Sequence, residues 1–349
     1  MSTLRSLNKT LLAAGLAVAT LFSPLASQAA DKLKIGTVVW AGYGPFYVAD
    51  KLDLFKPHDL DVELQFFNDP ALIPTAMVSR ALDGGMLTYD QVVASVAKGL
   101  KHRVVMPIDF SNGGDAIVAD ASIQSVADFK GKKVGFNPLS PSDFLLAYAL
   151  QQNGMSDQDI DAVNMTPEGI PGAMASGNLP VGVTYEPNVS QILSMGGGDK
   201  FKVVYSSKDA PGLITDVLVF DEAVIARKPA AIKAMIQGYM DGLAYMQAHP
   251  EESAEIIGEV LGVSAEEAVE QMAGAYNIPL AEMGKSFAPG EDTHSFHGSG
   301  AIIAKLLKDN GQIPTIPDFS QTYDAQFTEA LAQQADAGRA IARLCWRRP

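Results

Sequence analysis

The chain has 349 residues, 26 of them basic and 40 acidic, and a formal net charge of −14. That length accommodates two domains, and the acidic excess argues against nucleic acid or an anionic membrane surface as a partner. Cys345 is the only cysteine, so no intramolecular disulfide can form, and we expect its thiol to be free or to pair with another molecule.

Residues 1–30 are typical of a secretory signal peptide. Arg5 and Lys9 precede an apolar stretch, Leu11–Leu25, and small residues then lead to a cleavage site near Ala29 or Ala30. The stretch is too short and too rich in alanine for a retained membrane span, and no cysteine or twin-arginine pair lies near the site. We therefore expect an exported, periplasmic protein of about 319 residues with a formal net charge of −16.

The first predicted unit is a strand, a turn and a helix start. Residues 34–40 form a β-branched run that ends at Trp40, and residues 41–45 hold two glycines and a proline, which predict a turn. Pro45 suits the first turn of a helix that begins near Phe46. Trp40 and Tyr43 then face either a ligand or the core, because such a turn often lies at a ligand site in α/β folds.

Strand and helix patterns alternate along most of the remaining chain. Strand patterns occupy 60–67, 86–90, 103–110, 163–165, 181–185 and 201–205, with a short helix, a turn and a strand in 126–136. Helix patterns occupy 71–81, 91–98, 144–151, 170–176, 230–248, 251–261, 264–275 and 297–309. This order predicts an α/β protein with a mainly parallel sheet covered by helices on both faces.

Five separated blocks carry a family resemblance: WAGYGPFYVADKLDLF, DFSNGGDAIVA, SVADFKGKKVGFNPLSPSDFLLAYALQQNGM, GVTYEPNVSQIL and SSKDAPGLITDVLVF. In this order they resemble the NitT/TauT family, the periplasmic substrate-binding proteins of ABC importers for nitrate, taurine and other sulfonates, and the thiamine pyrimidine precursor. The resemblance spans roughly residues 33 to 330. It specifies the family and leaves the ligand open.

The resemblance implies a type II periplasmic-binding fold, in which two α/β lobes enclose a ligand cleft. We expect lobe one at 31–116 plus 217–335, lobe two at 117–216, crossovers near Asp115–Ala116 and Thr215–Asp216, and a peripheral basic tail at 336–349. It also implies a monomer that closes on a small molecule and delivers it to permease subunits, without a cofactor or catalysis.

By the same resemblance, the cleft residues lie at strand ends and helix starts. The expected ligand-binding residues are Trp40, Tyr43, Tyr89, Asp90, Asp115, Ser140, Ser142, Tyr185, Glu186 and Asp216. Thr88 is expected beside Tyr89, and Asp109 near a crossover. Ser140 or Ser142 caps the following helix and leaves amide groups free to face a ligand.

The expected cleft is acidic, which departs from an anion site. The predicted cleft segments contain no Arg or Lys, but they contain Asp90, Asp115, Glu186 and Asp216. Buried carboxylates need a partner, so we expect an amine, guanidine-like or amino-pyrimidine ligand, stacked on Trp40. The helix start at Ser140–Ser142 favours an anionic group instead, and a zwitterion satisfies both. A nitrate or sulfonate ligand remains the alternative.

Each acidic residue also has a structural interpretation. Asp90 could cap the helix from Gln91, Asp115 and Asp216 could bond crossover backbone, and Glu186 could be a structural strand-end residue.

Two other kinds of site are considered and set aside. His294 and His297, next to Glu291 and Asp292, suggest turn and capping residues more than a metal site. A periplasmic enzyme or a pyrimidine-synthesis enzyme on this fold is the rival class. The signal peptide and the lack of a cysteine-rich motif argue against the second of these.

Overall fold

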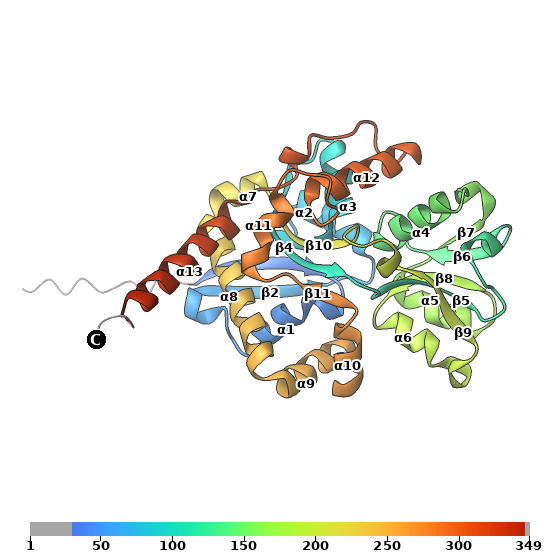
Figure 1. Ribbon diagram of the computed structural model, residues 1–349, viewed down its shortest axis with the longest axis horizontal. Helices are drawn as coiled ribbons and strands as arrows, with labels where there is room; N and C mark the ends of the chain where they lie inside the picture. Colours follow the sequence, from blue (N-terminus) through green and yellow to red (C-terminus); the bar gives the residue numbers. More distant parts are fainter. Residues whose placement is uncertain (1–29, 346–349) are drawn as a thin grey trace, which may run out of the picture.

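A computed structural model describes residues 30–345, with side chains up to residue 337. Nearly all of the expected signal peptide lies outside the described residues. The chain forms two lobes, each built on its own β-sheet with helices packed against it (Figure 1). Both lobes have the expected α/β arrangement.

Lobe one holds a six-stranded sheet in the order β11-β4-β10-β3-β1-β2. Its first part comprises β1 (Asp31–Thr37), α1 (Gly44–Lys51), β2 (Leu60–Phe66), α2 (Ile73–Val78), β3 (Gly84–Thr88), α3 (Tyr89–Ala97) and β4 (His102–Ser111). Its second part comprises β10 (Thr215–Asp221), α7 (Glu222–Arg227), α8 (Pro229–Ala248), α9 (Pro250–Leu261), α10 (Ala265–Met272), β11 (Ala275–Asn277), α11 (Leu280–Phe287), α12 (Phe296–Asp309) and α13 (Gln326–Cys345).

Lobe two holds a five-stranded sheet in the order β7-β6-β8-β5-β9. It comprises β5 (Asp115–Asp120), β6 (Lys133–Phe136), α4 (Pro141–Gln152), β7 (Asp161–Asn164), α5 (Ile170–Ala175), β8 (Val181–Tyr185), α6 (Asn188–Leu193) and β9 (Phe201–Ser206). Residues of β5 alternate between two hydrophobic clusters, Ile117 and Ala119 in one and Ala116 and Val118 in the other. Because side chains alternate across a strand, this sheet is buried on both faces.

Two segments connect the lobes. Residues 112–114 lead from β4 into β5, and residues 207–214 lead from β9 back into β10. The hydroxyls of Ser111 and Ser207, 2.8 Å apart, join the two segments, and the Gly113 amide donates to Ser207 Oγ at 2.6 Å. The connections therefore lie a few residues before their expected positions, since Asp115 already belongs to β5 and Thr215 to β10.

In each lobe, the first strand after a connection from the other lobe is antiparallel to both of its neighbours. In lobe one, β10 is antiparallel to both β3 and β4, and in lobe two, β5 is antiparallel to both β8 and β9. With β11 also antiparallel to β4, antiparallel strand pairs outnumber parallel ones, and the prediction of a mainly parallel sheet is wrong. Through these two strands, residues that are distant in the sequence become cross-strand partners. Such pairs lie at the end of each sheet that faces the other lobe.

Several element boundaries also differ from expectation. Tyr89 and Asp90 begin α3 and do not end a strand, because Thr88 is the N-cap and Gln91 completes its capping box. The expected helix 264–275 ends at Met272, and its last residue starts the short strand β11.

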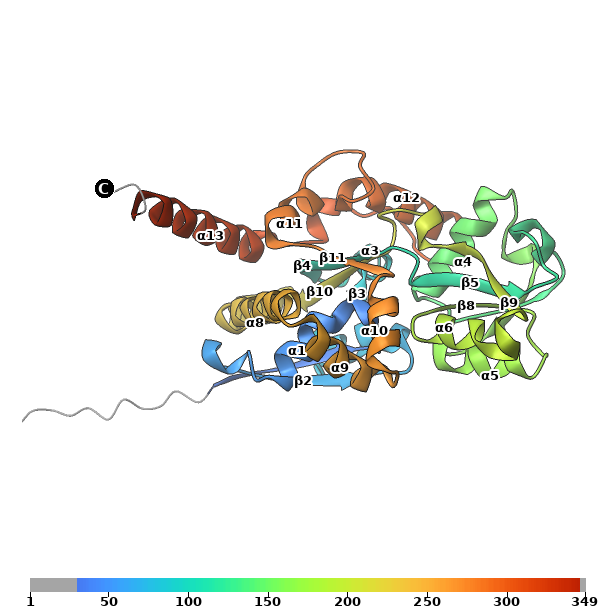
Figure 2. The same ribbon diagram turned by 60° about the horizontal axis from the view of Figure 1, so that its bottom comes forward.

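The expected peripheral tail is part of a helix as far as Cys345. This helix, α13, packs against α11 and α8 near its start and projects away from lobe one (Figures 1 and 2). Residues 346–349 lie outside the described part. No helix within residues 30–345 has the length and apolar character needed to cross a membrane.

Candidate ligand-binding cleft

A narrow cavity lies between the lobes at the ends of the two sheets. Its free volume is about 20 Å³, room for about one water molecule, so the lobes must separate to admit a ligand. Lobe one lines it with Val38, Trp40, Tyr43, Pro70, Met86, Leu87, Thr88, Gln91 and Asp216, and lobe two with Asp115, Pro141 and Tyr185. Five of the ten predicted site residues are therefore brought together: Trp40, Tyr43, Asp115, Tyr185 and Asp216.

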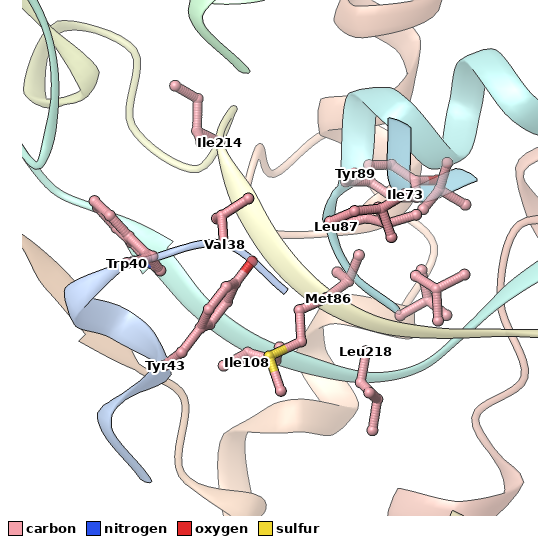
Figure 3. Packing of buried hydrophobic residues seen from close by; sticks show 14 of the residues in the cluster. Val38, Trp40, Tyr43, Ile73, Met86, Leu87, Tyr89, Ile108, Ile214 and Leu218 are labelled. Atoms are coloured by element: carbon pink, nitrogen blue, oxygen red, sulfur yellow. The ribbon is translucent and has the colours of Figure 1, made fainter. Parts of the chain in front are cut away.

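Two aromatic side chains from opposite lobes form one wall. The rings of Trp40 and Tyr185 meet edge to face, with centroids 6.1 Å apart and planes at 88°. Gly114 makes room for this arrangement, because a Cβ there would collide with the Trp40 ring. Figure 3 shows Trp40 and Tyr43 together at the start of α1, near Val38.

Asp109 holds the Trp40 ring in place from behind. The indole Nε1–H lies 3.3 Å from both carboxylate oxygens of Asp109, whose side chain is fully buried. Gly42 is again a close approach, because a Cβ there would collide with Asp109 and with Trp40 Nε1. The orientation of Trp40 therefore depends on a buried carboxylate that sequence reasoning had placed only near a crossover.

Strand pairing brings a second carboxylate beside the first. Asp216 on β10 is directly opposite Asp109 on β4 and Thr88 on β3, and cross-strand partners share one face of a sheet. Asp216 is 4% exposed and accepts a hydrogen bond of 2.5 Å from the Tyr43 hydroxyl. Burial, together with the charge of Asp109, raises the pKa of Asp216 well above its usual range.

The third carboxylate comes from lobe two. Asp115 on β5 is opposite Tyr185 on β8, which explains why both face the cavity. Burial raises the pKa of Asp115 to about 7, and burial with the charge of Asp115 also raises the pKa of Asp109. Among the described residues, no ion pair includes Asp109, Asp115 or Asp216, and no Lys, Arg or His lines the cavity.

Tyr185 adds a free polar atom to this acidic space. Its side chain is 3% exposed, and its hydroxyl has no hydrogen-bond partner among the described residues. A buried hydroxyl without a partner is costly. A ligand that hydrogen-bonds to it would remove that cost.

Two predicted residues serve the fold and do not line the cavity. The Tyr89 hydroxyl bonds to the Phe296 carbonyl at 3.0 Å and to Thr322 Oγ1 at 2.8 Å, and its ring lies beside Ile73 and Leu87 in Figure 3. The Glu186 carboxylate accepts the Ser190 amide at 3.0 Å and the Ser190 hydroxyl at 2.9 Å, at the start of α6. The predictions for Tyr89 and Glu186 are therefore corrected, because tertiary contacts use the Tyr89 hydroxyl and a local contact with Ser190 uses the Glu186 carboxylate.

Three further predicted residues lie next to the cleft. Asp90 and Ser140 line a separate cavity, and Ser142 is buried without lining either one. Ser140 is the N-cap of α4, as expected, and accepts the Ser142 amide at 3.2 Å. The expected capping role of Asp90 is wrong, because Thr88 caps α3.

The residues that sequence reasoning missed are mostly apolar. Val38, Met86 and Leu87 line the cavity although their pattern is that of ordinary buried strand residues, and Pro70 and Pro141 carry no polar signal. Gln91 could have been found as part of a capping box with Thr88. Its position between the two cavities depends on how the lobes meet.

The two histidines considered for a metal have separate partners. His294 Nδ1 lies 2.9 Å from Asp292 Oδ1, and His297 Nε2 lies 3.0 Å from the Tyr323 hydroxyl. Ser295 between them is the N-cap of α12, where it accepts the Gly298 amide. The described residues contain no group of three side chains suited to a metal ion.

Comparison with known proteins identifies the family of this chain. Residues 40–253 match the family described as NMT1/THI5 like. The chain belongs to this family. Among relatives of this NMT1/THI5-like protein, a binding protein of Brucella abortus is 24% identical over 62% of this chain and 67% of its own length. The taurine-binding periplasmic protein of Escherichia coli is 22% identical over 78% of this chain and 86% of its own length.

Solved structures confirm the fold of this NMT1/THI5-like protein. The aliphatic sulphonate binding protein of E. coli superposes with a TM-score of 0.67 at 19% identity, over 84% of this chain and 97% of that one. The nitrate-binding protein of Synechocystis superposes with a TM-score of 0.68 at 15% identity, over 87% of this chain and 88% of that one. A desulfurization enzyme superposes with a TM-score of 0.60 at 12% identity, over 87% of this chain and 99% of that one. The predicted periplasmic-binding fold and family resemblance are therefore confirmed.

Proposed function

We propose that this protein is the solute-binding component of an ABC importer, and that it captures a small nitrogenous cation or zwitterion between its lobes in the periplasm. Its family, its two-lobed fold and the names of its relatives support the transport role. In this role it acts as a monomer, closes on the ligand, and presents the closed form to permease subunits.

The observation that carries the ligand class is the group of cleft carboxylates without a basic partner, whose raised pKa values reflect that missing partner. Asp115 from lobe two and Asp216 from lobe one line the cavity, with Asp109 behind Trp40. An ionised carboxylate in a buried site is costly unless it is paired. A ligand with an ammonium, amidine or guanidinium group supplies the missing partner, and it does so best when both lobes are closed.

The aromatic wall fits the same ligand. A cation over the face of Trp40 gains cation–π attraction, and a flat ring such as an amino-pyrimidine gains stacking. The Tyr185 hydroxyl, which has no partner among the described residues, can donate to or accept from a polar group of the ligand. A ligand with a cationic end and a hydrogen-bonding end therefore uses all three features of the cleft.

The alternative function on the same fold is binding of nitrate or a sulfonate, which the relatives' names favour. Because burial raises the pKa of Asp115 to about 7, a fraction of the molecules carry a proton there at neutral pH and can donate a hydrogen bond to an anion. Taurine has an ammonium group as well as a sulfonate, so a zwitterion is consistent with either view.

Thermal unfolding against a panel of small molecules tests the proposal. The panel holds amines, guanidine-type compounds, amino-pyrimidines, amino acids, taurine, other sulfonates and nitrate. A ligand at about 100 times its dissociation constant adds roughly 2.7 kcal/mol to the free energy of unfolding, which raises Tm by several degrees.

Two tyrosine variants test the role of the Tyr185 hydroxyl. Tyr185→Phe should lower the affinity for the active compound about tenfold, because it removes one hydrogen bond, while Tyr276→Phe, at an exposed tyrosine, should leave it unchanged. A Tm rise with nitrate or sulfonates lacking an amine, and with nothing cationic, contradicts the ligand class. Turnover of the active compound by the protein would support an enzyme instead.

A further inference from the structure

Two side-chain hydrogen bonds join the lobes where α12 and α4 approach each other (Figure 1). Gln312, just after α12 in lobe one, donates from its side-chain amide to Asp143 Oδ2 at 2.9 Å. Gln91, in α3 of lobe one, donates to the Leu139 carbonyl at 3.3 Å. Both acceptors belong to residues 139–143 of lobe two, which lead into α4. Among the described residues, no other side-chain hydrogen bond crosses between the lobes outside the connecting segments.

Lobe one fixes both donors through its own local contacts. Gly311 follows the end of α12 with a left-handed φ of 71°, and it turns the chain so that the Gln312 backbone amide closes the helix end. The amide oxygen of Gln91 accepts the Thr88 amide at 3.2 Å, and its nitrogen also donates to the Pro70 carbonyl at 3.2 Å. Since these contacts already restrict both residues, little conformational freedom is lost when they bond to lobe two.

Lobe two presents the acceptors through a strained turn. Leu139 has a left-handed φ of 60°, a conformation that leucine rarely adopts and that costs free energy. Its side chain is 52% exposed, so side-chain packing does not impose this conformation. Asp143 Oδ2 accepts the Leu139 amide at 2.8 Å, and Gln91 bonds to the carbonyl of the same residue. The turn thereby presents the Leu139 carbonyl and the Asp143 carboxylate to the same edge of lobe one.

These two bonds lie at the edge of the ligand cavity. Gln91 and Pro70 line that cavity from lobe one, and Pro141, between the two acceptors, lines it from lobe two. With the bonds in place, the free volume of about 20 Å³ holds about one water molecule. The lobes must therefore separate, and the bonds between them break, before a ligand enters. The conformation that closes around a ligand is wider than this shut one.

We propose that Gln312, Gln91 and residues 139–143 form a latch, which holds the lobes shut and competes with ligand entry. The bond from Gln312 is the stronger one, because its acceptor is a carboxylate. A ligand binds only the molecules whose latch is open, so its apparent affinity falls as the shut fraction grows. Gln312 does not line the ligand cavity and so sets the affinity without touching the ligand. The latch itself does not depend on the ligand class, whereas its effect on affinity rests on the proposed function.

Quenching of Trp40 fluorescence by acrylamide tests the latch without a ligand. Trp40 lines the ligand cavity and is 3% exposed, so acrylamide reaches it only when the lobes separate. Trp346→Phe in every protein compared leaves Trp40 as the only tryptophan. Gln312→Ala removes the donor, and the ratio of open to shut molecules should rise about tenfold. Gln312→Glu also places a second carboxylate beside Asp143, so quenching should rise further, together with the radius of gyration in small-angle scattering.

Gln326→Glu is the matched control. The Gln326 side-chain amide also donates to a carboxylate, Asp324 Oδ2 at 2.6 Å, but both residues belong to lobe one. This variant should leave quenching and the radius of gyration unchanged. Equal values in Gln312→Glu and the protein with Gln312 intact overturn the proposal, and so does an equal rise in Gln326→Glu, which would be a general effect of added charge. Both measurements are made without ligand, so a failure of the proposed function does not affect them.

Discussion

Buried carboxylates have different surroundings in the cleft of this NMT1/THI5-like protein and at the start of α6. At α6, Glu186 accepts two hydrogen bonds from Ser190 and completes a helix end. In the cleft, Asp115 lines a cavity without an ion pair, and Asp216 accepts a hydrogen bond from the Tyr43 hydroxyl. Asp115 begins a strand and Glu186 follows one, so their local sequence patterns do not distinguish them. The difference lies between a carboxylate that its own helix start satisfies and carboxylates that line a cavity without a basic partner.

The largest expected effect concerns Asp115. Replacing Asp115 with Asn removes the charge that lobe two presents to the ligand, and we expect the affinity for a cationic ligand to fall by about 100-fold or more. Isothermal titration calorimetry measures it. Asp120→Asn, at the other end of the same strand and outside the cavity, is the matched control. An unchanged affinity in Asp115→Asn would show that the cleft carboxylates are structural, as Glu186 is.

The second prediction sharpens the contrast through pH. Because the folded-state pKa of Asp115 is raised to about 7 from an unfolded value near 3.9, the folded protein binds the proton more tightly. Its contribution to stability is complete below about pH 4 and is lost as the pH rises through 7. We expect the ligand-free protein to lose stability from pH 5 to pH 8 by about 1 to 3 kcal/mol relative to Asp115→Asn, measured by urea unfolding.

The affinity should show the reverse dependence. A cation prefers the ionised carboxylate, so its affinity should rise between pH 5 and pH 8 and level off above, whereas an anion should bind more weakly over the same range. Calorimetry at several pH values separates the two ligand classes. A flat profile for a cationic ligand would mean that Asp115 does not touch it.

A third prediction concerns the hydrogen bond between Trp40 and Asp109. Trp40→Phe keeps an aromatic wall but removes the indole N–H that Asp109 accepts. A buried acceptor without a donor costs about 1 to 3 kcal/mol, so we expect a loss of that size in the free energy of unfolding, larger at high pH where Asp109 is ionised. Equal stability of Trp40→Phe and the wild type would mean that the hydrogen bond is not needed.

The smallest effect is expected at Glu186. Glu186→Gln retains one acceptor for Ser190, so stability should fall by about 1 kcal/mol or less. Its ligand-induced rise in Tm should equal that of the wild type, which a thermal shift assay compares directly. If this variant lost the response as Asp115→Asn should, the distinction between the two kinds of carboxylate would be wrong.

Much of the architecture could be predicted from local patterns. The strand, turn and helix around Trp40 appear within a few residues of their expected positions, because β-branched runs, Pro45 and the two glycines act through neighbouring backbone. The boundary between β3 and α3 was missed because a capping box at Thr88 and Gln91 overrode the apolar run. The short strand β11 carries almost no local signal and forms through its pairing with β4.

For the site, the sequence by itself determined the chemical inventory: aromatic residues at a turn, acidic residues at strand ends and helix starts, and no basic residue among the predicted cleft positions. Tertiary structure alone decided which of them meet. Asp109 and Asp216 become neighbours because β10 returns from lobe two and runs antiparallel to β4, while the Tyr89 hydroxyl finds its partner at the distant Phe296 carbonyl. The physical reason is that strand pairing and lobe contacts act between residues far apart in the chain, and a local pattern carries no information about the donors that those contacts bring.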